Sequence, residues 1–343
     1  MPNLECPLLS IVILNYNGKR FLDSCLTSIF KQNFSNFQVV FVDNASTDES
    51  VTFVKKHYAY DPRLKIVENK RNSGPIEGNN IGIRLVNLQT KYVVLLNNDT
   101  ELTQNWLSCM INAMEQDPKI GAACSKQLLM NDRARLQGFG SFIDPCGFNY
   151  LLWENEIDRN QFNNDTFEVF AGGTTALFVR ASLLRQVGLL DSNYNHGFDD
   201  VDLCWRIWLS GYKVVCVSSC AMYHKVAGTT SKVKMEHVLF HREKNRIMTT
   251  IKNYSLPYLL RFLPLILVFD FTQLIWFAFK RRSNMFKAIV RALFWDIQHF
   301  KYIWSQHLIV QRQIRKSSDK EIISHMVKIN LRQLWQRIIP LSI

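Results

Sequence analysis

Carboxylate side chains in this sequence stand directly after short apolar runs or at the start of a predicted helix. Asp43 ends one apolar run, and Asp99 follows another, Tyr92–Leu96, after two asparagines. Asp199 and Asp200 open a segment with helical spacing. In an open parallel sheet, ligands bind beyond the carboxyl ends of the strands, so Asp43 and Asp99 are expected at one edge. Such residues support cation binding through oxygen ligands and proton transfer by a carboxylate.

Each of these residues, taken alone, also has a structural interpretation. Asp43 and its neighbours are good helix N-caps, and Asp99 would suit an ordinary turn. Acids in a first helical turn, such as Asp199 and Asp200, are favoured by the helix dipole without any catalytic role. His224 follows a predicted strand, and a single histidine is more often structural than a metal ligand. Both interpretations stay open for each residue by itself.

The elements that must position these residues alternate in type through the first half of the chain. Short apolar runs alternate with helix-like segments, which predicts a parallel sheet covered by helices. The spacing of Ser46 and Glu49 is that of a capping box. From Pro118 to Phe170 the pattern loosens and predicts loops. The expected strands are Ser10–Asn15, Gln38–Asp43, Leu64–Glu68, Tyr92–Asn97, Ala176–Val179 and Lys213–Val217. The expected helices are Lys19–Lys31, Ser46–Tyr58, Gly78–Leu88, Asn105–Gln116, Ala181–Gln186 and Val201–Ser210.

A change of composition near Ser255 divides the chain of 343 residues into an α/β domain, residues 1–255, and a tail, residues 256–343. The segment Leu256–Phe279 is strongly apolar, but it contains Asp270 among other polar residues. A membrane span needs about 20 apolar residues, and a central aspartate costs about 2.5–3.5 kcal/mol. The segment is therefore predicted to lie in the membrane interface rather than to cross the bilayer.

The formal charge of +12 belongs mainly to the tail, because Lys280–Ile343 holds 13 lysines and arginines against three acidic residues. Apolar residues between Phe286 and Leu308 recur at steps of three and four among basic ones, which predicts a basic amphipathic helix. This pattern fits an anionic membrane surface. Nucleic-acid binding is disfavoured, because the aromatic residues lie on the apolar stripe. The alternative is a helix packed on the same chain or on a second copy, which leaves a homo-oligomer open.

The eight cysteines are scattered, without a CxxC pair and without a preceding secretory signal. They are expected to be reduced residues of a cytosolic domain. The predicted location is the cytoplasmic face of a membrane, in peripheral or monotopic attachment.

Seven motifs in order resemble those of family 2 glycosyltransferases over about residues 8–254, and are closest to the rhamnosyltransferase-like branch. Any one would be weak evidence, whereas their order and spacing together are specific. The motifs are Ser10–Gly18, Val42–Asp48, Asn69–Gly74 with Gly78–Gly82, Leu95–Thr100, Gly172-Gly173, Phe198–Arg206, and Gly211–Val214 with His224. In the branch, Gln137–Gly140 with Gly147 also finds a counterpart.

The resemblance implies a GT-A fold for residues 1–255, with a mostly parallel central sheet flanked by helices and a helical, membrane-associated extension behind it. It implies an inverting transfer from a UDP- or dTDP-sugar, with Mn²⁺ or Mg²⁺, to a hydroxyl of a saccharide or lipid-linked saccharide. Surface polysaccharide synthesis is the natural pathway.

The resemblance also assigns roles by motif. Asp43 would hold the base, with Asn15, Asn17, Ser46 and Asn98 near the nucleotide. Asp99 would bind the metal with His224 as a second ligand, Asp200 would be the base catalyst, and Asp199 would support it. Asn245 and Arg246 would touch the leaving diphosphate.

Two departures from the family pattern stand at the site. Asn97-Asn98-Asp99 keeps one carboxylate where the metal motif has two, and Asp199 replaces the usual glutamate of an acidic pair. The first departure gives footing to a rival hypothesis, a non-catalytic membrane-attached protein of the same fold. A nucleotidyltransferase is disfavoured because no Gly-rich basic loop follows the first strand, and the absence of GxGxxG there speaks against a Rossmann dehydrogenase.

Overall fold

The apolar runs of the first half form one edge of a large sheet in the computed structural model of the protein, which describes residues 7–162, 165–225 and 234–329. Parallel strands lie in the order β3-β2-β1-β4. Their bounds are β1 Leu9–Asn15, β2 Phe37–Asp43, β3 Leu64–Glu68 and β4 Tyr92–Asn97. The four strands predicted for this half are confirmed to within one residue, with the branched and aromatic residues of β1, β2 and β4 buried and those of the edge strand β3 half-buried.

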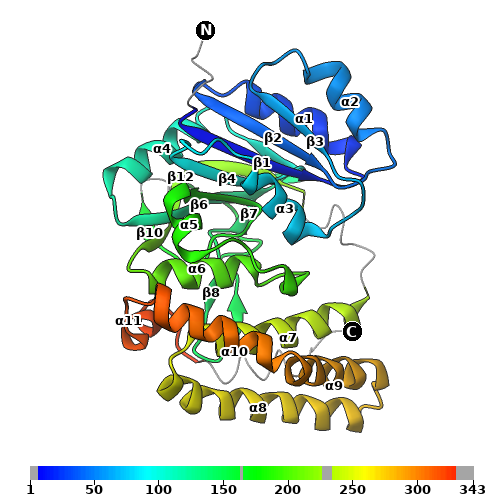
Figure 1. The fold of residues 1–343 in the computed structure, drawn as a ribbon, viewed down its shortest axis with the longest axis vertical. Coiled ribbons are helices and arrows are strands. Elements are labelled where there is room, and N and C mark those ends of the chain that lie inside the picture. Colours follow the sequence, from blue (N-terminus) through cyan, green and yellow to red (C-terminus); the bar gives the residue numbers. More distant parts are fainter. Residues whose placement is uncertain (1–6, 163–164, 226–233, 330–343) are drawn as a thin grey trace.

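Helices connect these strands and cover both faces of the sheet (Figure 1). They are α1 Lys19–Phe30, α2 Ser50–Tyr58, α3 Pro75–Arg84 and α4 Trp106–Gln116. Two starts differ from the prediction. Helix α3 begins earlier, at a proline suited to the first helical turn. Helix α2 begins later, and the predicted capping box is wrong, because the Ser46 hydroxyl accepts the backbone N–H of Asn17 instead.

Beyond β4 the sheet becomes mixed. Strand β11 (Ala176–Arg180) runs antiparallel to β4 and to β6 (Ile120–Leu129), and β12 (Lys213–His224) runs parallel to β6. Shorter strands complete it: β5 Thr100–Leu102, β7 Asp132–Gly138 and β10 Thr166–Glu168, with a separate hairpin of β8 Phe142–Ile143 and β9 Asn149–Tyr150. The expectation of loops over Pro118–Phe170 is therefore wrong for β6, a buried central strand.

The second half of the sheet domain adds helices on one face. They are α5 Ala181–Val187, the 3₁₀ turn Ser192–Tyr194, α6 Asp199–Leu209 and α7 Met235–Asn253. Helix α6 is buried on nearly all sides, between the sheet and α7. One core fills the space between the sheet and α1 and α4, and a second lies between the sheet and α5, α6 and α7.

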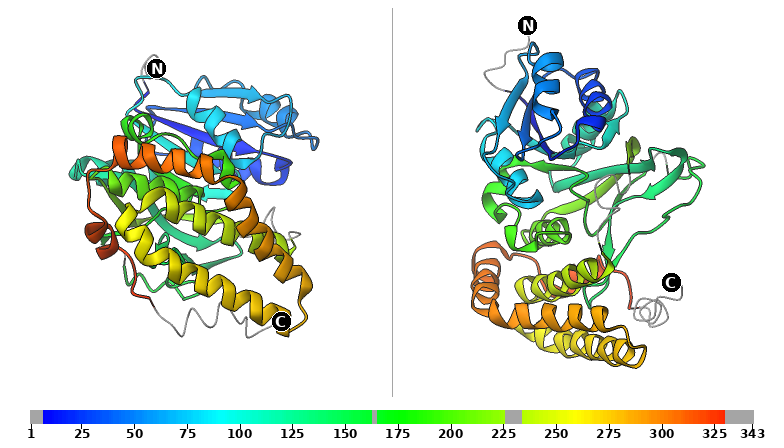
Figure 2. Two further views of the ribbon diagram at one scale, coloured as in Figure 1. Left: turned by 60° about the horizontal axis from the view of Figure 1, so that its bottom comes forward. Right: turned by 90° about the vertical axis from the view of Figure 1, so that its right-hand side faces the viewer.

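The tail forms a helical layer against α7 on the side away from the sheet (Figures 1 and 2). Its helices are α8 Leu256–Phe279, α9 Ser283–Gln298, α10 Phe300–Ile309 and α11 Asp319–Ser324, with a π-helical turn at Val310–Ile314. The predicted single amphipathic helix is interrupted at His299. Within α9 Ile289 is buried and Ile297 exposed, and in α10 Ile303 is buried and Phe300 exposed.

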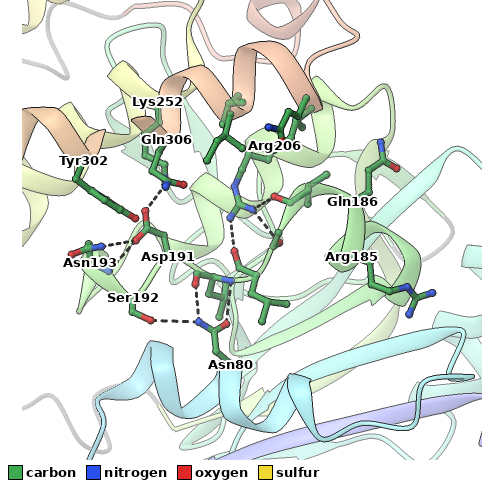
Figure 3. A pocket seen from close by; sticks show the side chains of 18 of the residues that line it. Asn80, Arg185, Gln186, Asp191, Ser192, Asn193, Arg206, Lys252, Tyr302 and Gln306 are labelled. Carbon is green, nitrogen blue, oxygen red and sulfur yellow. Dashed lines mark hydrogen bonds and ion pairs between the residues drawn. The ribbon is translucent and has the colours of Figure 1, made fainter. Parts of the chain in front are cut away.

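A segment between α5 and α6 connects α3, α6 and α7 beside the helical layer (Figure 3). Lys252 of α7 lies 2.6 Å from Asp191, and Arg206 of α6 donates to the carbonyl oxygen atoms of Gly188 and Leu189. From α3, Asn80 donates to the carbonyl of Leu190. These residues line a pocket of about 580 Å³ that also touches α10. Most of the polar interactions in Figure 3 join residues of the pocket wall to one another. The polar lining of this pocket is therefore explained by its structural role.

The cysteines depart from the prediction in one pair. Cys109 of α4 and Cys220 of β12 form a disulfide, so the expectation that all cysteines are reduced is wrong for these two. The other cysteines in the described part of the chain are free and buried, at positions 25, 124, 146, 204 and 216. Cys6 lies outside the described residues.

Candidate active site

A cleft of about 420 Å³ opens at the carboxyl ends of β1 and β4. Its walls come from the end of β4, the first turn of α3, the loop Asn195–Gly197 and the first turn of α6. Asp99 lines it from one side, and Asp199 and Asp200 line it from another. The structure therefore brings together acidic residues that are separated by a hundred positions in the sequence.

A buried hydrogen-bond network surrounds Asp43 beside this cleft. The Asn15 amide donates to Asp43 Oδ1 over 2.9 Å and to Ser46 Oγ over 3.1 Å. The Ser46 backbone N–H donates to Asp43 Oδ2 over 2.8 Å. Asn98, which lines the cleft, donates to Asn15 Oδ1 over 2.6 Å. Four of the predicted nucleotide-site residues are thus joined in one network, at the ends of three parallel strands or just beyond them.

Gly18 and Asn17 explain how the chain leaves β1. A Cβ atom on Gly18 would lie 2.0 Å from the Asn98 amide nitrogen, so only glycine permits the contact between Asn98 and Asn15. Asn17 has a φ of 50° and accepts the backbone N–H of Thr47 with its side chain. Asn17 does not line the cleft. It borders a shallower depression with Lys19 and Asp48, on another side of this turn.

Asn44 is a site residue that the sequence interpretation left without a role. Its buried side chain accepts hydrogen bonds from Asn69 and Ser73, and donates to Asn72 and the carbonyl of Gly74. It therefore fixes the loop that leads into α3 and lines the cleft. The motif Asn69–Gly74, which is noted above without a function, is the signal that pointed to it.

Asp99 and His224 form a pair at the junction of β5 and β12. The Nε2 atom of His224 lies 3.4 Å from Asp99 Oδ1, and the Nδ1 atom lies 2.9 Å from Gln137 Oε1. An amide oxygen only accepts hydrogen bonds, so the contact with Gln137 is made by a proton on Nδ1 of the imidazole. Within residues 7–162, 165–225 and 234–329, no group of three or more His, Cys, Asp or Glu side chains has the geometry of a metal site.

The other acidic pair opens α6 directly after a strained loop. Asn195, Gly197 and Phe198 all have positive φ, of 57°, 71° and 68°. Asp200 accepts the Val201 backbone N–H over 2.8 Å. Burial raises the pKa of both Asp199 and Asp200, and the Asp200 charge raises that of Asp199 further. A carboxylate with a raised pKa is a better proton acceptor near neutral pH.

The side chain of Asn245, on α7, binds this loop through hydrogen bonds. Its side-chain amide nitrogen donates to the carbonyl oxygen atoms of Tyr194, His196 and Gly197, over 3.0, 2.8 and 2.9 Å. Asn245 is fully buried and does not line the cleft. In this structure it contacts the loop before the acidic pair, in place of the expected contact with a diphosphate.

Arg246 points away from the cleft, and the expected contact with a diphosphate does not fit its place. It is fully buried and donates to Glu243 of α7 and to Asp270 of α8. A guanidinium requires paired carboxylates once it is buried, so this network explains the residue. The sequence offered no sign of it, because the partner acid lies in the tail.

Comparison with known proteins gives one family. The model of the Glycosyl transferase family 2 matches residues 10–185, just over half of the chain. A protein of Haemophilus influenzae described as an uncharacterized glycosyltransferase is 22% identical over 262 residues, which are 75% of each chain. Of three further relatives, the chain spans 24–45% of the length.

Solved structures with the same fold hold nucleotide sugars. TarS of S. aureus (residues 1–349), in complex with UDP-GlcNAc, is 16% identical with a TM-score of 0.57, and the match covers 92% of this chain and 88% of that one. The mannosyltransferase PcManGT of Pyrobaculum calidifontis, in complex with GDP-Man and Mn²⁺, is 16% identical with a TM-score of 0.52, covering 87% and 77%. These likenesses show a GT-A-like α/β fold, as expected from the motifs.

Proposed function

Since the chain belongs to glycosyl transferase family 2, we propose that it transfers a sugar from a nucleotide diphosphate donor to an acceptor hydroxyl, with inversion at the anomeric carbon. The observation that carries this proposal is the cleft that joins Asp99, on the metal side, to Asp200, on the proton side. A single displacement needs one proton acceptor and stabilisation of the leaving group, and these two residues meet those needs.

The donor is proposed to be a UDP- or dTDP-sugar. The transferred sugar is proposed to be a hexose, in particular rhamnose. Asp43 is held by Asn15 and Ser46 through one hydrogen bond on each carboxylate oxygen. Each oxygen keeps a further lone pair, so Asp43 can accept from the imide of a pyrimidine. The complexes of TarS with UDP-GlcNAc and of PcManGT with GDP-Man support a nucleotide sugar at this fold.

Asp99 and His224 fit a divalent cation, Mn²⁺ or Mg²⁺. A carboxylate oxygen and an imidazole nitrogen face each other across 3.4 Å, and each can donate an electron pair to a cation once it carries no proton. A cation that also binds two phosphates would need only one or two such protein ligands. When bound, it would offset negative charge on the departing diphosphate. The contact of Gln137 with His224 orients the imidazole so that Nε2 faces Asp99.

Asp200 is proposed to take the proton of the attacking hydroxyl. It lies in the cleft wall opposite β4, and its raised pKa suits it to this task. Asp199 supports it, because burial and the Asp200 charge raise the pKa of Asp199 to about 8, so that Asp199 keeps its proton while Asp200 ionises. Gly173 leaves room in front of the base, since a Cβ atom there would lie 3.7 Å from Asp200 Oδ2.

The acceptor is proposed to be a saccharide or lipid-linked saccharide at the cytoplasmic face of a membrane, in surface polysaccharide synthesis. The support is the family and the helical layer, whose outer face is apolar.

The test is incubation of the purified protein with Mn²⁺ and a panel of nucleotide sugars, with release of UDP or dTDP as the readout. Asp200→Asn is expected to lower the turnover by about 100-fold or more while nucleotide binding persists. Binding of a nucleotide without any turnover by the native chain would favour the non-catalytic alternative. The proposal is refuted if the purified protein neither binds nor turns over any nucleotide sugar of the panel.

A further inference from the structure

Helix α8 has its polarity reversed relative to an ordinary surface helix. Judged by length and composition, α8 is long and apolar enough to cross a membrane, and no other helix among the described residues is. The mean hydropathy of α8 is 1.9. Apart from Arg261, every exposed side chain on it is apolar. Val268, Phe271 and Ile275, on successive turns, are 62%, 63% and 57% exposed. Soluble helices place such residues inward.

The polar residues of α8 lie on its inner face instead. Asp270 is fully buried and accepts from Arg246, and Gln273 is buried and accepts from Arg242 over 3.1 Å. Apolar residues of the same face pack on α7 and α9. Detaching α8 would expose this face and leave Arg246 with one partner fewer. The helix is therefore fixed along its length to the rest of the molecule (Figure 2).

The exposed charges on α8 and on the turn that follows it have one sign, whereas Lys287 and Arg291 of α9 share a pocket with Glu236 of α7. The exposed ionisable side chains of α8 and α9 and of the turn between them are all basic, namely Arg261, Lys280, Arg281, Lys287 and Arg291. The acidic residues between positions 256 and 318 are Asp270 and Asp296, and both are buried. An apolar strip bordered by cations alone complements a bilayer with anionic headgroups.

We propose that the outer face of α8, with the basic residues beside it, binds in the plane of an anionic phospholipid bilayer. Val268, Phe271 and Ile275 enter the acyl region, while Lys280 and Arg281 contact headgroup phosphates. The inner face stays on α7 and α9, so the helix does not cross the bilayer. The binding face lies on α8, the segment predicted to lie in the membrane interface, whereas in the predicted amphipathic stripe of α9 and α10 Ile289 is buried.

A second copy of the chain fits this face less well. A symmetric dimer places the same patch on both sides of the interface. Here it would bring two sets of arginines and lysines together without an exposed acid from α8 or α9 to pair with them. Such like-charge contacts cost free energy. Lipid supplies both the apolar phase and the opposite charge.

The test is flotation of the full chain with vesicles of phosphatidylcholine alone, or of phosphatidylcholine and phosphatidylglycerol in equal parts. The variant Val268→Gln, Phe271→Gln, Ile275→Gln is expected to lower partitioning onto both vesicle types, by more than about 100-fold onto the anionic ones. The variant Lys280→Gln, Arg281→Gln is expected to lower partitioning about 30-fold on the anionic vesicles and little on the neutral ones.

Matched controls carry the same changes on the sheet domain. Tyr60→Gln with Leu88→Gln alters exposed apolar residues, and Lys56→Gln with Lys119→Gln removes exposed charges. Both are expected to float like the native chain. Thermal unfolding of every variant checks the fold, and release of nucleotide from the donor is expected to stay unchanged, so failure here is distinguishable from failure of the proposed function.

Two results would overturn the proposal. One is that the native chain stays in the bottom fraction of the gradient, or that the triple variant floats as well as the native chain does. The other is a native dimer in sedimentation velocity that the triple variant dissociates, which would assign the face to a second copy.

Discussion

Asn245→Ala is expected to slow catalysis without touching the donor site. The native amide group supplies two hydrogens to three carbonyl oxygen atoms of the loop before Asp199 and Asp200. That loop holds several residues at positive φ, a conformation that persists only when the surroundings enforce it. Without the amide, the loop can relax and carry the first turn of α6 with it.

The magnitude follows from the number of bonds lost. Each lost hydrogen bond to a buried carbonyl costs about 1–2 kcal/mol, so the free energy of unfolding should fall by about 2–4 kcal/mol. A displacement of the base by about 1 Å costs about 100-fold in rate, so kcat is expected to fall between about 10- and 100-fold. The KM for the donor should change less than about threefold, because Asn245 lies outside the cleft.

The assay is steady-state kinetics with the donor found in the nucleotide-sugar panel, together with urea unfolding. The split between kcat and KM separates the two roles considered for this residue. A contact with the diphosphate would raise KM and weaken UDP binding, whereas a loop anchor lowers kcat. Asn253→Ala is the matched control, since Asn253 is an equally buried amide on α7 that donates to Asp202 instead. Unchanged kcat in Asn245→Ala, at a measurable loss of stability, would refute the reasoning.

Three further outcomes are expected. Because burial raises the pKa of Asp200 and a base must be ionised to act, kcat/KM should fall with decreasing pH in a limb that lies above the ordinary aspartate value of about 4; a limb at that value would contradict it. His224→Ala should weaken Mn²⁺ binding about tenfold or more, measured by the signal of the free ion in electron paramagnetic resonance, with Gln137→Ala giving a smaller loss. Asp270→Ala should lower the free energy of unfolding by about 1–3 kcal/mol in urea, because it removes one of the two carboxylates that accept from the buried Arg246 and leaves only Glu243.

The parallel half of the sheet could be predicted because its strands are dense in buried branched residues and end in polar ones. Asp43 and Asp99 follow from those ends directly. Strand β6 could not be predicted in the same way, since Ile120–Leu129 holds a glycine and polar residues in its middle. Its Ser125 accepts from Trp106, and its Lys126 pairs with Asp158 over 2.6 Å. Both partners come from other elements, so the strand is stable only once these are in place.

The acidic residues of the site could be predicted from the sequence, but the residues that hold them in place could not. Motif order placed Asp99, Asp199 and Asp200 together, and the structure confirms that they line one cleft. The functions of Asn245 and Arg246 depend on what lies opposite each face of α7, which no local spacing encodes. Adjacent residues on a helix point about 100° apart, so neighbours in a motif need not serve one site.

Because Asn245 and Arg246 point in different directions from α7, this helix contacts both the loop before the base and the helix that carries the proposed membrane face. Asn245 reaches the loop before Asp199, and Arg246, the next residue, binds Asp270 on the inner side of α8. One rigid helix therefore fixes both the carboxylate pair and the helix that we place on lipid. With α8 on the bilayer as proposed, α7 lies between that surface and the helix α6 that begins with the carboxylate pair (Figure 1).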